Sequence, residues 1–149
     1  METALQHNPL WPSALGALQA HFRTWRDASV APNARHWAAL AGDLRALGLD
    51  KGTRDALLGW ADTQAEQARS EALKMRLLHP MEREMLTVEA HGYLLDLYRL
   101  GLLDMLGLEQ VLEHCAALTR LPAGREQVEA LAQRVLSENI AAQGFGTAH

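Results

Sequence analysis

The residues best able to do chemistry lie in one stretch near the middle of the chain, where histidine and carboxylate side chains crowd together. A helical metal site favours ligands three or four residues apart, as in Glu-x-x-His. His79 and Glu82 have that spacing, but His79 stands at a predicted helix start rather than inside the helix. Glu84 and His91 are seven residues apart, which is about 10 Å along a helix axis. Helix capping and solvated surface therefore explain these side chains better than a metal site, and we expect no metal or cofactor.

The single cysteine is the other reactive side chain, and its position predicts packing rather than catalysis. Cys115 falls on the apolar stripe of a predicted helix, where buried cysteine behaves as a small hydrophobe. The neighbouring His114 points about 100° away on an ideal helix, which disfavours a nucleophile pair. The sequence contains no His-Glu-x-x-His motif and no glycine-rich phosphate loop. We expect no catalytic and no cofactor-binding residues, and therefore a protein that is not an enzyme.

Arginine, lysine and tryptophan side chains are the remaining candidates, because they contact phosphates, bases and partner proteins. The one locally basic stretch contains Arg69, Lys74, Arg76 and Arg83. A phosphate-contacting patch is one interpretation of this stretch, but a solvated face offset by acidic neighbours is favoured. Trp25, Trp37 and Trp60 fall on helical stripes, which favours core packing over base stacking. Trp11, near the chain start, and Arg23 and Arg26, which lie off their helical stripe, are further candidate contacts for a partner.

Length, charge and cysteine content bound the class of protein. A chain of 149 residues suits one domain, and 48% hydrophobic with 21% charged residues is ordinary for a globular fold. The net charge of −4 argues against a surface that tracks nucleic-acid backbone throughout. One cysteine excludes an intramolecular disulfide and favours a reducing compartment. Charges within residues 93–112 exclude a membrane span there, so we expect a cytoplasmic protein.

The elements that must position these residues are helices, because apolar residues recur at helical spacing and no stretch alternates as a strand does. The clearest stripe comprises Trp11, Leu15, Leu18, Phe22 and Trp25. Later stripes comprise Trp37, Leu40, Leu44 and Leu47; Leu57, Trp60, Ala61 and Gln64; Leu108, Val111, Leu112, Cys115 and Leu118; and Val128, Leu131, Val135 and Ile140. Asp50 is a predicted helix cap and Pro122 a predicted helix start. The sequence predicts an all-α, compact bundle of about six helices, with one domain over residues 10–142 and flexible ends at 1–9 and 143–149.

The best-defined predicted helix is central and apolar, and runs from Pro80 to about Leu100. Proline fits the first helical position, where its missing N–H removes no bond. Glu82 can then supply half of a capping box to His79, and Glu84 places negative charge near the positive helix end. These residues are accounted for by a helix start.

Gly92 lies inside that predicted helix, where glycine costs about 0.5–1 kcal/mol relative to alanine. The segment after it is apolar on every face, which is typical of a helix buried all round. We therefore interpret Gly92 as the point where a neighbouring helix crosses closely. Asp96 and Arg99, three residues apart, could pair with each other.

The central segment also resembles a known family. The matching pattern is Arg76-Leu77-x-x-Pro80-x-Glu82-x-Glu84-x-Leu86, then Gly92-Tyr93-Leu94-Leu95-x-Leu97, Leu103 and Glu109-x-Val111-Leu112-Glu113. This pattern, with a second block over residues 47–60, resembles the bacterial Smg family, although the family usually has Thr or Ser at the position of His79. The resemblance implies a small cytoplasmic bacterial protein of a conserved family of unknown function, with no established catalytic residues. In some bacteria the Smg gene lies beside one for a DNA-processing protein.

From these observations we expect a non-enzymatic, Smg-like helical interaction or regulatory protein that acts through a protein partner. The amphipathic first helix and the side of the central helix are the expected docking surfaces, and a homodimer would also bury surplus apolar surface. The alternative is a nucleic-acid-binding accessory factor in DNA processing that uses the basic patch around Arg69–Arg83. A third hypothesis, ranked last, is an enzyme with a metal or carboxylate site around His79, Glu82 and Glu84. We expect no membrane association.

Overall fold

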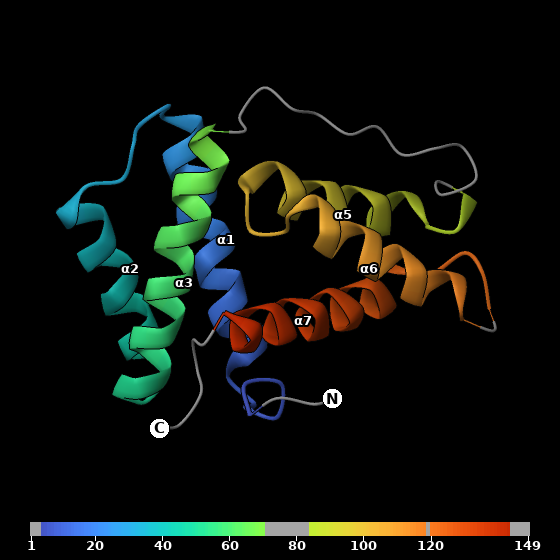
Figure 1. Cartoon of the computed structure of the whole chain (residues 1–149), viewed down its shortest axis with the longest axis horizontal. Helices are drawn as coiled ribbons and strands as arrows, with labels where there is room; N and C mark the ends of the chain where they lie inside the picture. The colour runs from blue at the N-terminus through green and yellow to red at the C-terminus, as the bar shows by residue number, and fades with distance from the viewer. Residues whose placement is uncertain (1–3, 71–83, 119, 144–149) are drawn as a thin grey trace.

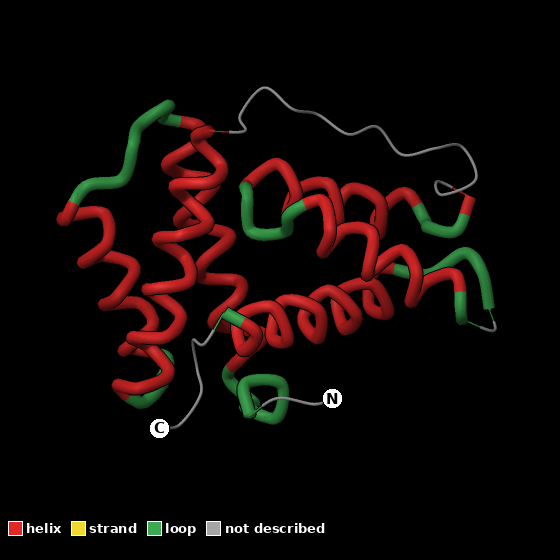
Figure 2. Tube along the Cα trace, viewed as in Figure 1, coloured by secondary structure: helices red, strands yellow, loops and turns green. Residues whose placement is uncertain are grey.

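The computed structural model describes residues 4–70, 84–118 and 120–143, with the side chains of residues 69 and 70 left out. These residues form six helices. Figure 2 shows helices and loops and no strand among them. The helices are α1 (Trp11–Asp27), α2 (Ala34–Ala46), α3 (Lys51–Ser70), α5 (Val88–Leu100), α6 (Met105–Ala116) and α7 (Arg125–Ala142). The predicted all-α bundle is confirmed.

The helices form two units of three, which lie side by side in Figure 1. In the N-terminal unit α1, α2 and α3 run alternately up and down (Figure 1), with α2 packed against both of the others. In the C-terminal unit α5 and α7 run in the same direction and α6 runs in the opposite direction (Figure 1). The units meet where α1 packs against α5 and α7, and where α3 packs against α7. Because α7 also packs against α5 and α6, it contacts both units.

The predicted apolar stripes form the core. The whole α1 stripe from Trp11 to Trp25 is buried, as are the four predicted residues of α3, including Gln64. Trp37, Leu47, Leu118 and Leu131 are partly buried and pack against the core. Leu5, within the segment predicted to be a loose end, also packs against it. Helical periodicity therefore identified the interior, because burial follows the 3.6-residue repeat.

The predicted helix from Pro80 is corrected by the structure, because the helix that carries Leu94 and Leu97 begins at Val88. Thr87 is its N-cap and accepts a hydrogen bond from the backbone N–H of Ala90 at 3.2 Å. Before it, the chain leaves the helical path to pair with residues that precede α7. Thr87 N–H donates to the Ala123 carbonyl at 3.0 Å, and Ala123 N–H donates to the Met85 carbonyl at 2.7 Å. His79, Pro80 and Glu82 lie outside the described residues, and Glu84 is exposed.

The predicted close crossing at Gly92 is also wrong. Gly92 is exposed, and a Cβ built on it meets no atom within 4 Å. The close approach occurs at Gly101, which ends α5 with a left-handed φ of 86°. A Cβ built on Gly101 would overlap the Cβ of Ala68 on α3. Glycine is thus required where α3 crosses the end of α5, both for space and for backbone conformation.

Three local predictions have mixed outcomes. Asp50 does cap α3, since its Oδ1 accepts the Thr53 N–H at 2.7 Å, and this bond lowers the pKa of the carboxyl group. The last helix begins at Arg125 rather than Pro122, because Gly124 supplies the N-cap and Gln127 bonds back to its N–H. Asp96 pairs with Arg23 of α1 rather than with Arg99, and so joins the two units.

Candidate functional site

The residues predicted to contact a partner are dispersed. The Trp11 side chain is buried, and its Nε1–H donates to the Gln133 carbonyl at 3.0 Å, so the indole joins α1 to α7. Arg23 forms an ion pair with Asp96, while Arg26 is exposed in the last turn of α1. The Arg69 side chain and all of Lys74, Arg76 and Arg83 lie outside the described residues.

The histidine and carboxylate cluster around residues 79–91 is only partly described. Glu84 is exposed, and His91 is half-buried with a partner of its own. Within residues 4–70, 84–118 and 120–143, no three His, Cys, Asp or Glu side chains come together as metal ligands would. Burial raises the pKa of the Cys115 thiol, which keeps it in the less nucleophilic protonated form.

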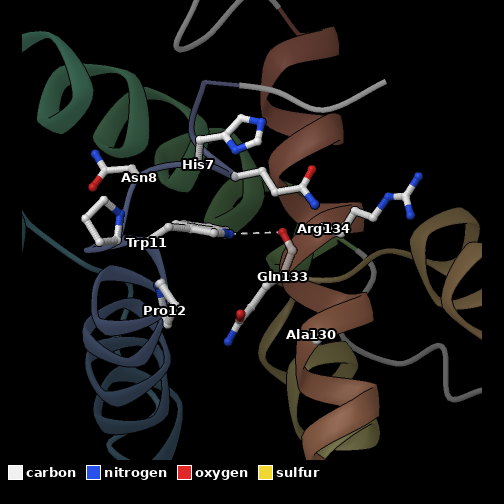
Figure 3. Close-up of a pocket in the computed structure, with 9 residues that line it drawn as sticks. His7, Asn8, Trp11, Pro12, Ala130, Gln133 and Arg134 are labelled. Carbon is white, nitrogen blue, oxygen red and sulfur yellow. Dashed lines mark hydrogen bonds between the residues drawn. The ribbon is translucent and has the colours of Figure 1, made fainter.

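A shallow pocket of about 300 Å³ lies between the N-terminal segment and α7 (Figure 3). It is lined by Gln6, His7, Asn8, Pro9, Trp11, Pro12, Ala130, Gln133 and Arg134. Two of its polar side chains bond within the chain: Asn8 Oδ1 accepts the Leu10 N–H at 2.9 Å, and Arg134 Nε donates to Glu138 at 3.2 Å. The Trp11 bond holds the start of α1 against α7, and the pocket lies beside this contact.

An aromatic seam, formed by Phe22, Trp25 and Trp37 with His21 and His36, joins α1 to α2. Trp25 lies at its centre, 4.9 Å from the Trp37 ring and 5.1 Å from the Phe22 ring. The two histidine rings each lie 6.1 Å from it. His21 Nε2 bonds Asp43 at 2.6 Å, and His36 Nδ1 accepts the N–H of the helix cap Asn33 at 3.0 Å. Both histidines thus have structural bonds.

A polar cluster fixes α5 to α7 in the C-terminal unit. The Arg125 guanidinium lies 5.5 Å from the Tyr93 ring centre, a cation–π distance. The same guanidinium donates to Glu129 at 2.7 Å, and that bond raises the pKa of Arg125. Burial, and then the nearby Glu129 charge, raise the pKa of Tyr93. The phenol therefore stays protonated and uncharged at neutral pH.

The outer surface of α6 differs from these clusters because its side chains are directed to solvent. Its buried stripe consists of Leu108, Val111, Leu112 and Cys115. Met105, which flanks this stripe in the first turn, is 48% exposed. On the opposite side Leu106 is 64% exposed, and Glu109 and Glu113 are exposed beside it. We call these four residues the acidic face of α6. This face was not predicted from the sequence, where its one signal is a pair of large apolar residues, Met105 and Leu106, off the buried stripe.

The carboxylates of the acidic face have no ion-pair partner in the described part of the chain. No Lys or Arg occurs between Arg99 and Arg120, so the helix has no basic side chain of its own other than His114. Asp104, which caps the helix through the Gly107 N–H at 2.7 Å, adds a further negative charge at the same end. The face therefore presents exposed apolar area and uncompensated negative charge together.

A second exposed apolar pair lies at the other end of the C-terminal unit. Val88 is 84% and Leu121 is 51% exposed, and they flank the bridge between Leu86 and Ala123. No described helix is both long and apolar enough to cross a bilayer.

The fold and its surfaces define a small all-α protein whose described polar clusters serve mainly to hold helices together. The chain belongs to DUF494, a family of proteins of unknown function, whose model matches residues 22–145. This match confirms the resemblance to the Smg family. Comparison with curated proteins and with solved structures found no match. The family match begins inside α1, so pocket residues 6–12 lie before it, whereas the acidic face of α6 lies within it.

Proposed function

We propose that this protein is a non-enzymatic helical module of the cytoplasm that acts by binding a protein partner. The observation that carries the proposal is the exposure of Met105 and Leu106, two large apolar side chains in one turn of α6. Exposed apolar groups rimmed by polar residues are typical of interaction sites. Elsewhere, Trp11, Tyr93 and His21 are engaged in contacts between helices, which supports a structural role for those groups.

Affinity capture from a lysate of the source organism tests this function. The full chain is compared with Leu106→Asp and with Val30→Asp, a matched control at an apolar residue that is 42% exposed on the other unit. We expect a defined protein, identified by mass spectrometry, that survives nuclease treatment and is recovered with the control variant but not with Leu106→Asp. Loss of all partners on nuclease treatment would favour the nucleic-acid alternative, and recovery of no partner would overturn the proposal.

A further inference from the structure

We propose that the acidic face of α6 binds a cationic amphipathic helix of the partner protein. This inference rests on the proposed function and adds the chemistry of the partner. It is carried by three features of the face: the spacing of its side chains, its charge, and the absence of any described element packed over it.

The spacing matches helix-on-helix docking. Leu106, Glu109 and Glu113 follow one another at three and four residues, and therefore lie along one side of α6. From Leu106 to Glu113 this side extends about 10 Å, close to two helical turns. An apolar side chain of the bound helix would pack against Met105 and Leu106, and Lys or Arg side chains one and two turns further on would reach Glu109 and Glu113.

The charge selects a cationic occupant. Two half-buried carboxylates on α7 are paired within their own helix, Glu129 with Arg125 at 2.7 Å and Glu138 with Arg134 at 3.2 Å. Glu109 and Glu113 have no such neighbour, because α6 contains no Lys or Arg. Uncompensated carboxylates attract Lys and Arg and repel nucleic-acid phosphates.

The charge also disfavours a second copy of this chain as the occupant. A symmetric dimer places the same patch of both subunits in contact. Across such an interface the Glu109 and Glu113 carboxylates of one subunit would meet those of the other, and like charges in contact are unfavourable. A partner of opposite charge has no such cost.

Packing within the fold leaves this side of α6 open. The helix packs against α5 and α7 through its buried stripe. On its opposite side Leu106, Glu109, Glu113 and Ala117 are exposed and Gln110 is half-buried. A docked helix would therefore need no rearrangement of the bundle, which favours rapid association.

The probe is a fluorescently labelled synthetic peptide of about five helical turns, built from Leu and Lys in an amphipathic pattern. Binding to the full chain is measured by fluorescence anisotropy at low and high salt. We expect Glu109→Lys/Glu113→Lys to weaken binding at least about tenfold, and Leu106→Ser to weaken it several-fold at both salt concentrations. A Leu/Glu peptide of the same pattern should not bind.

The matched control is Asp62→Lys/Glu126→Lys, which changes the net charge equally at two exposed carboxylates outside α6. We expect it to bind the peptide as the native chain does. Equal weakening by both double variants would show attraction by net charge alone and would overturn the inference, as would failure of the native chain to bind. Circular dichroism checks folding, and Glu109→Gln/Glu113→Gln replaces the Lys variant if that one unfolds.

The inference and the proposed function fail differently. If lysate capture recovers a nuclease-resistant protein equally well with Glu109→Lys/Glu113→Lys, the protein has a partner but the carboxylates of the acidic face do not bind it. If capture recovers no protein at all, the proposed function fails, whatever the peptide does.

Discussion

The two three-helix units achieve the same packing with different side chains. All four tryptophans lie in the first 60 residues, and α2, which fully buries only Leu40 and Leu44, is held to α1 by the aromatic seam. The C-terminal unit instead packs small and aliphatic residues, so that α7 buries six side chains that include Ala132 and Ser137. Large rings bury a large area per residue, whereas small residues let helices approach closely. The N-terminal unit should therefore fail when a ring is removed, and the C-terminal unit when volume is added.

Removal of a buried ring should have the largest effect. Trp60 is 1% exposed in the core of the N-terminal unit, and we expect Trp60→Ala to lower the free energy of unfolding by about 3–5 kcal/mol, through lost burial and a residual cavity. Chemical denaturation measures this change. Trp60→Phe is the control: it keeps a ring and removes an indole N–H that has no hydrogen-bond partner, so it should cost clearly less. Equal losses from both variants would contradict the ring-packing account.

Addition of a single methyl group should have an intermediate effect that changes sign with position. In Gly101→Ala the alanine would have to adopt the left-handed φ of this position, and its Cβ would clash with Ala68. We expect this variant to lower the free energy of unfolding by about 1–3 kcal/mol. Gly92→Ala adds the same methyl group to an exposed helical site with no atom nearby, and should stabilise the fold by about 0.5–1 kcal/mol. Urea unfolding of both variants provides the comparison. If Gly92→Ala destabilised the fold, that result would instead support the close helix crossing that the sequence predicted at Gly92.

Acid should produce the smallest effect, through a cap of the N-terminal unit. The bond from the Thr53 N–H lowers the pKa of Asp50 in the folded state, so its stabilising effect is present above about pH 4 and is lost as the pH falls through the lower, folded-state pKa. Asparagine also caps helices but does not titrate in this range. Thermal unfolding between pH 7 and pH 3 should therefore show a shallower acid loss for Asp50→Asn than for the native chain. Identical acid profiles would assign the loss to other carboxylates.

In both the fold and the site, features set by local periodicity could be predicted from the sequence. Features set by contacts between distant residues could not. Stripes such as Trp11 to Trp25 were predictable because burial imposes a local period. The helix start at Val88 was not, because Met85 and Thr87 bond to Ala123, far along the chain. The role of Gly101 depends on Ala68 in another helix. The acidic face of α6 was missed because the buried stripe was used to describe that helix, and exposure of Leu106 depends on what packs around it.

The hydrogen bond from Trp11 to the Gln133 carbonyl has a consequence for the order in which the chain folds. The two residues are 122 positions apart, so their contact closes a loop that spans most of the polypeptide. The entropy of closing so long a loop is offset only once intervening helices have shortened it. The anchoring of the first turn of α1 on α7 should therefore be a late event in folding. By the same reasoning it should be among the first contacts to open in the native ensemble, which would make amide exchange fastest where the chain enters its first helix.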